Sequence, residues 1–121
     1  MARIFNLARK STLALRQRKA FLLQSITPSP DFLRASVVER FSVCGKRQCH
    51  CRQKGAKHGP YYYLTQCLAV GKINKFLLKT PEQLQDARTG VEGFHQVQDR
   101  LEELSQINAE LLRRGERLLS E

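Results

Sequence analysis

The 121-residue chain lacks several features that would assign it to a common class of protein. No apolar run approaches the roughly 18 residues of a membrane span, and the N-terminus lacks the uninterrupted apolar stretch of a signal peptide. There is no acidic cluster for catalytic Mg²⁺, no glycine-rich phosphate loop and no evident pair of nucleophile and base. We therefore expect a cytoplasmic protein that is not an enzyme. Residues 1–30 carry six basic residues and no acid, which an amphipathic mitochondrial presequence would also show.

Acidic residues are also missing from the middle of the chain. The net charge is +10, and residues 1–60 hold thirteen Lys or Arg against two acids, whereas residues 61–121 hold eight against nine. Between Arg40 and Lys79 there is no Asp or Glu at all. Such a field of one sign attracts a polyanion, and we expect nucleic acid, with DNA favoured over RNA. The alternatives are an acidic protein, a membrane surface, or lysines that only solvate an exposed loop.

Cysteines and histidines cluster in one short segment of this basic region. Cys44, Cys49, Cys51 and His58 have the spacing C-x4-C-x-C-x6-H, which supplies the four donors of a closed tetrahedral zinc site. With every position taken by protein, no site is open for water, so the Zn²⁺ would be structural. His50 and Cys67 are alternative fourth ligands. A redox pair of thiols, or a thiol enzyme with one labile ligand, is a weaker alternative.

Basic side chains surround this segment and extend to both sides of it. The candidate nucleic-acid-binding residues are Arg16, Arg18, Lys19, Arg40, Lys46, Arg47, Arg52, Lys54, Lys57, Lys72 and Lys75. Three consecutive tyrosines, Tyr61, Tyr62 and Tyr63, follow the cysteines and alternate along a predicted strand, so at least one faces outward. An outward tyrosine can stack on an unpaired base, although such residues are more often core or interface.

Apolar periodicity and turn residues divide the chain into three parts. Residues 1–31 are a basic amphipathic helix, predicted over residues 3–24, followed by a proline-containing linker. Residues 32–80 are a zinc knuckle with strands at 36–43, 61–70 and 73–79; Gly59-Pro60 predicts a turn, and Gly71-Lys72 a tight hairpin. Residues 81–121 are a long helix. The expected fold is therefore α+β, with a three-stranded antiparallel meander.

The long helix has a clear start and a regular apolar stripe. Thr80 is the predicted N-cap, Pro81 the first helical residue and Gln83 the partner in a capping box, whereas Gly90 and Gly93 weaken the first turns or split off a short helix. A heptad seam then follows: Phe94, Val97, Leu101, Leu104, Asn108 and Leu111. A lone asparagine at an a position is typical of parallel two-stranded coils, so the seam predicts a homodimer. The alternative is one amphipathic helix lying on its own sheet, with a stripe widened by Ile107 and Leu112.

The strings VVERFSVCGKRQCHC and HGPYYYL, followed by a GK hairpin and a Leu/Glu/Arg-rich helix, resemble a family of small prokaryotic proteins of unknown function. The resemblance covers roughly residues 33–115, and several family members carry transposase-like labels. It implies a zinc-knuckle and hairpin unit with a C-terminal helix. The matching positions are Cys44, Gly45, Lys46, Cys49, Cys51, His58, Gly59, Pro60 and Tyr61.

Together these patterns predict a zinc-stabilised accessory protein that binds nucleic acid, acting in transposition, recombination or transcriptional regulation at a mobile element. The alternative is an adaptor whose long helix docks a larger partner such as a transposase or nuclease. No membrane partner is expected.

Overall fold

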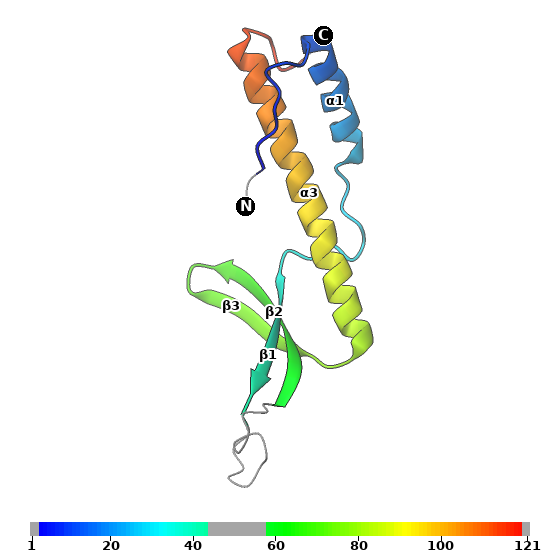
Figure 1. Cartoon of the computed structure of the whole chain (residues 1–121), viewed down its shortest axis with the longest axis vertical. Coiled ribbons are helices and arrows are strands. Elements are labelled where there is room, and N and C mark those ends of the chain that lie inside the picture. The colour runs from blue at the N-terminus through cyan, green and yellow to red at the C-terminus, as the bar shows by residue number, and fades with distance from the viewer. Residues whose placement is uncertain (1–2, 44–57, 120–121) are drawn as a thin grey trace. The chain divides into compact units, whose positions relative to one another are not determined.

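The computed structural model of the chain describes residues 3–43 and 58–119 and has the predicted α+β composition (Figure 1). Its elements follow in the order α1 (Thr12–Ser25), β1 (Ser36–Ser42), β2 (His58–Ala69), β3 (Lys72–Leu78) and α3 (Pro81–Arg113). They form two compact units. The helical unit combines residues 1–30 with residues 93–121, and the sheet unit is residues 31–92. Within the described part of the chain, neither helix is long and apolar enough to cross a membrane.

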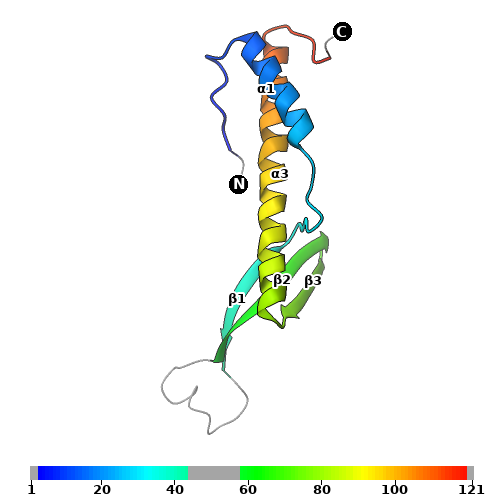
Figure 2. The same ribbon diagram turned by 90° about the vertical axis from the view of Figure 1, so that its right-hand side faces the viewer.

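The sheet unit contains the predicted antiparallel meander, with strand order β1-β2-β3 (Figure 2). Gly59 and Pro60 do not form a turn as the sequence suggested, because both lie inside β2. The hairpin is also displaced by one residue. Ala69 pairs with Lys72, so the two-residue turn is Val70-Gly71, and Gly71 supplies the positive φ of 77° that the turn requires.

Helix α3 starts as its sequence predicts. The Gln83 backbone N–H donates to Thr80 Oγ1 at 3.1 Å, which satisfies one of the unpaired donors of the first turn. The Gln83 side chain reaches back to the backbone N–H of Lys79 at 2.9 Å, one residue before the position expected in a capping box. The helix start is therefore capped from both directions.

The two glycines near the start of α3 do not split it, because the helix is continuous from Pro81 to Arg113. Gly90 is buried where the incoming chain crosses the helix, and its carbonyl accepts the N–H of Leu33 at 3.1 Å. A Cβ at Gly90 would collide with the backbone oxygen of Asp31. Glycine is thus required at this position for close packing and not as a break in the helix.

The helix predicted over residues 81–121 ends early, at a C-terminal cap formed by Gly115. Gly115 has φ 82°, its N–H donates to Leu112 O at 2.9 Å, and the Glu116 N–H donates to Leu111 O at 2.8 Å. This pair of bonds is a Schellman motif, in which glycine takes the left-handed position after the last turn. Residues beyond Gly115 therefore leave the helix axis.

The N-terminal helix is shorter than the predicted span of residues 3–24. It begins at Thr12, where Ser11 caps it by accepting the Ala14 N–H at 3.0 Å. The preceding residues are held by a side chain of α3 instead. Gln106 accepts the Phe5 N–H through Oε1 at 3.0 Å and donates from Nε2 to Arg3 O at 2.6 Å. The side-chain amide of Gln106 thus forms hydrogen bonds with two backbone groups that would be paired with each other's neighbours if this segment were helical.

Helices α1 and α3 are antiparallel within the helical unit, since Arg100 bonds to Ser25 O and Arg114 bonds to Thr12 Oγ1. The core between them consists of five buried side chains: Leu7, Leu15, Leu22, Ile107 and Leu111. Four more pack around it: Phe5, Ile26, Leu104 and Leu118. Ile4 and Leu7 both precede α1, but Leu7 is buried in this core whereas Ile4 is exposed.

Candidate zinc loop and open sheet face

The loop that carries the three candidate zinc-binding cysteines begins and ends at one end of the sheet. Cys44, Cys49, Cys51 and the alternative ligand His50 lie outside the described residues, as do Lys46, Arg47, Arg52, Lys54 and Lys57. His58 is the first residue of β2 and pairs with Ser42, the last residue of β1. Among the described residues no group of three metal-ligating side chains occurs. The predicted zinc site therefore stays a prediction, with three of its four candidate ligands outside the described residues.

The sheet geometry separates the two described candidates for the fourth zinc ligand. Cys67 lies nine residues beyond His58 on β2 and pairs with Ile73 near the hairpin. At about 3.3 Å per residue this places Cys67 roughly 30 Å from the end where the loop is attached. His58, in contrast, lies at the end of β2 from which residues 44–57 connect to β1. Cys67 is instead an exposed free cysteine of the described chain.

A bulge shapes the strands where they enter this loop. The β1–β2 register shifts between Arg40 and Ser42, where Phe41 of β1 lies opposite both Gly59 and Pro60, so the extra residue is on β2. Gly59 has a φ of 134°, and a Cβ there would lie 2.8 Å from Arg40 O. The tight approach of the two backbones therefore requires glycine at position 59.

One face of the sheet carries aromatic and basic side chains together. Pairing of Tyr61 with Arg40 and of Tyr63 with Val38 and Leu77 places these residues on the same face, which we call the open face. Lys75, opposite Thr65, belongs to it as well, and its Nζ lies 5.0 Å from the centre of the Tyr63 ring. Among the described strand pairs no Asp or Glu has a position on this face.

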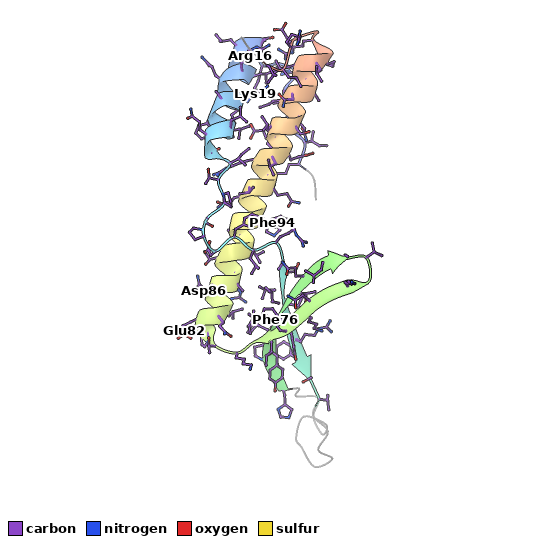
Figure 3. The ribbon with its side chains drawn as sticks, turned by 180° about the vertical axis from the view of Figure 1, so that it is seen from behind. Arg16, Lys19, Phe76, Glu82, Asp86 and Phe94 are labelled. Atoms are coloured by element: carbon purple, nitrogen blue, oxygen red, sulfur yellow. The ribbon has the colours of Figure 1, made fainter. Side chains whose placement is uncertain are left out.

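The opposite face carries Tyr62 and Leu64 and is the one that α3 approaches. Leu64 is only 4% exposed, and the guanidinium of Arg88, on α3, lies 5.2 Å from the centre of the Tyr62 ring. Phe76, which pairs with Leu64, shares this face and remains partly exposed (Figure 3). The three consecutive tyrosines are thus divided between an open and a covered face.

The candidate basic residues of α1 are engaged within the helical unit. Arg16 donates to Arg117 O at 2.9 Å and lies 3.7 Å from a Glu116 carboxylate oxygen, and Lys19 donates to Leu118 O at 2.6 Å. Figure 3 shows Arg16 and Lys19 beside the C-terminal end of α3. These hydrogen bonds and this ion pair hold residues 116–118 against α1.

Arg18 makes the strongest of these contacts. It donates to Glu103 through two parallel bonds, at 2.7 Å to Oε2 and 2.9 Å to Oε1. The Glu103 side chain is buried, and this forked hydrogen bonding from Arg18 lowers the pKa of its carboxyl despite the opposing effect of desolvation. Arg18 thus compensates a buried negative charge in the helical unit.

The predicted dimer seam is used in part within the chain. Leu111 and the neighbouring Ile107 are fully buried against α1, and Leu104 packs beside them. Leu101 is half exposed, and Phe94 and Val97 are partly buried. The buried stripe of α3 packs against α1. The expected alternative to a coiled coil was packing against the sheet. Self-association remains a prediction.

Residues 12–67 match the family model described as a domain of unknown function (DUF6788). This match supports the sequence-based assignment to a family of unknown function and covers α1, β1, the cysteine-containing loop and most of β2. No curated protein and no solved structure is significantly similar to the chain.

Proposed function

We propose that the chain binds nucleic acid through its sheet unit, with a structural Zn²⁺ organising residues 44–57. The proposal rests on the open face, where Arg40 and Lys75 lie beside two tyrosines and no carboxylate of the described strand pairs is present. This face continues toward the loop that carries Lys46, Arg47, Arg52, Lys54 and Lys57. A polyanion that follows the face would meet positive charge along its whole path.

The donor set and the sheet register both support the zinc site. Three thiolates and one imidazole match a closed tetrahedral site, with Cys44, Cys49, Cys51 and His58 as proposed ligands. Because Ser42 pairs with His58, the loop leaves and re-enters the sheet at the same end, which is the arrangement a short chelating loop needs. A rigid basic loop loses less entropy when it contacts phosphate than a flexible loop does.

We leave the three basic residues of α1 out of the proposed interface. Arg16 and Arg18 are paired with carboxylates, and Lys19 is bonded to a backbone carbonyl. The proposed role is binding without catalysis. On the resemblance to proteins with transposase-like labels, we propose that the chain acts at a mobile element, as an accessory of transposition or recombination or as a transcriptional regulator.

Fluorescence anisotropy across a salt series tests nucleic-acid binding. Zinc-loaded protein is titrated into labelled duplex DNA, single-stranded DNA and structured RNA, and the slope of log affinity against log salt counts phosphate contacts, at about −0.9 per contact on duplex DNA. We expect the variant Lys46→Ala/Arg47→Ala/Arg52→Ala/Lys54→Ala to flatten the slope. A matched variant, Arg3→Ala/Arg9→Ala/Lys10→Ala/Arg117→Ala, removes four positive charges from the helical unit and should leave the slope nearly unchanged.

The main alternative is an adaptor whose α3 docks a larger protein. Burial of Ile107 and Leu111 against α1 leaves less of the apolar stripe for such a partner, which is why we rank this function second. Absence of nucleic-acid binding at low salt by folded, zinc-loaded protein would favour the adaptor.

A further inference from the structure

We infer that the ligand of the open face is an unpaired nucleic-acid strand, and that Tyr61 and Tyr63 each stack on a base. This inference rests on the proposed function and specifies its ligand. Tyr61 and Tyr63 are two residues apart on β2, so they project from the same face with a spacing of roughly 6.6 Å. Aromatic side chains on an exposed sheet bind successive unstacked bases in this way.

The exposure of the open face leaves room for bases. Tyr61 is 39% exposed and Leu77, which pairs with Tyr63, is 38% exposed. A hollow of about 400 Å³ at the end of the sheet is lined by Tyr61 and Leu77 of the open face, by Tyr62 and Leu78 of the opposite face, and by Leu84 of α3, among others. A base that is turned out of the strand therefore has apolar surface next to the exposed ring.

The positive charges on the open face also favour an unpaired nucleic-acid strand as the ligand. The Lys75 ammonium lies over one face of the Tyr63 ring, 5.0 Å from its centre, and Arg40 is opposite Tyr61, so each tyrosine has a cation as a neighbour. Rings that receive bases and cations that receive phosphates are the two components of single-strand recognition. In a duplex the bases are stacked on one another, so tyrosines on a sheet face have no base surface to contact. An acidic protein would satisfy Arg40 and Lys75 but would give the tyrosines no specific role.

Tyrosine substitutions test this inference with a control at the neighbouring residue. The probes are fluorescein-labelled (dT)12, (rU)12 and a 12-base-pair DNA duplex, at one salt concentration. We expect both single strands to bind more tightly than the duplex, and the two strands to show whether DNA or RNA is preferred. Tyr61→Ala/Tyr63→Ala should weaken single-strand binding by about 100-fold, at roughly tenfold per lost stacking contact. Tyr61→Phe/Tyr63→Phe keeps the rings and should bind like wild type, as should Tyr62→Phe on the covered face.

A second readout uses the protein's own emission. The chain has three tyrosines and no tryptophan, so its intrinsic fluorescence comes from the tyrosines. Stacking should quench this fluorescence in wild type on addition of unlabelled (dT)12. If the double alanine variant proves unstable, the single variant Tyr61→Ala, at the more exposed position, should still weaken binding about tenfold.

The outcomes separate this inference from the proposed function. Tight binding of the duplex, unaffected by Tyr61→Ala/Tyr63→Ala but weakened by the loss of the loop's basic residues, would overturn single-strand recognition and leave nucleic-acid binding intact. No binding of any of the three probes would overturn both.

Discussion

His58 pairs with Ser42 across the end of the β1–β2 ladder, and this pairing brings both ends of the cysteine-containing loop together. The proposed zinc site depends on it. One proposed ligand, His58, lies on a strand that the sheet holds in register, and the other three proposed ligands belong to the segment between β1 and β2. Metal binding at such a position would tie the loop to the sheet and would contribute to the stability of the whole unit.

We predict that zinc removal unfolds the sheet unit. A structural zinc site of this type contributes roughly 10–16 kcal/mol of apparent folding free energy at neutral pH. Chelation should therefore abolish the cooperative thermal transition of this unit, and His58→Ala should lower the bound zinc measured by elemental analysis. Cys67→Ser is the control, because Cys67 is at the far end of β2 and should retain one zinc ion per chain. An unchanged melt in protein shown to be metal-free would contradict the prediction.

Substitution of Gly59 should destabilise the sheet more than substitution of Gly71. Both residues have positive φ angles, 134° and 77°, which strain any residue with a Cβ, and alanine at Gly71, near the left-handed helical region, costs about 1–2 kcal/mol. Only at Gly59 would the new Cβ also meet backbone, 2.8 Å from Arg40 O, whereas nothing lies within 4 Å at Gly71. Urea unfolding of Gly59→Ala and Gly71→Ala measures the difference. Equal losses of unfolding free energy in the two variants would contradict the close approach of the strands at the bulge.

Acid should weaken the helical unit through Glu110. Hydrogen bonds from Arg113 and Arg114 lower the pKa of this carboxyl from its ordinary 4.5 to about 2. A lowered pKa in the folded state stabilises the fold above pH 4.5, and the contribution disappears as the pH falls toward 2. Glu110→Gln should therefore be less stable than wild type at pH 7, and the difference should close near pH 2 in urea titrations. In Glu92→Gln, the control, no described ion pair is lost, and a similar pH-dependent difference there would contradict this account.

Asn108→Leu should raise the melting temperature without changing the oligomeric state. Among the described residues, no hydrogen-bond partner is present for the buried Oδ1 of Asn108, and such an acceptor costs about 1–3 kcal/mol. Because α1 already covers Leu104 and Leu111, we expect the apolar variant to pack within the chain. Calorimetry and sedimentation measure both properties, with the exposed position Ser105→Leu as control. A change in mass on substitution would instead support a coiled coil that uses Asn108 to set its register.

Local signals in the sequence were sufficient to predict the sheet and the start of α3. Val37, Val38 and the tyrosines identify strands by composition and alternation, and the Thr80-Pro81 pair identifies a helix start by its chemistry. Gly115, preceded by two arginines, is an equally local signal for a helix end. The prediction of a helix over residues 81–121 did not take this signal into account.

Tertiary contacts account for what the sequence could not predict. The unwound segment before Ser11 depends on Gln106, about a hundred residues away, whose amide pairs with the backbone at Arg3 and Phe5. The heptad pattern identified a stripe through Leu104 and Leu111 but not its partner, since the same spacing serves a second copy of the chain and a helix of the same chain equally well. The alternation of the tyrosines predicted two faces, but the burial of Leu64 and the position of Arg88 over the Tyr62 ring are needed to show which face is covered.

The most direct test of the account is chemical-shift mapping of isotope-labelled, zinc-loaded protein on titration with (dT)12. Our account predicts that amide signals around Arg40, Tyr61, Tyr63 and Lys75 shift in proportion to bound strand, while those of α1 from Arg16 to Lys19 stay in place. Shifts confined to α1, or no shifts anywhere at low salt, would contradict the claim that the sheet unit binds nucleic acid.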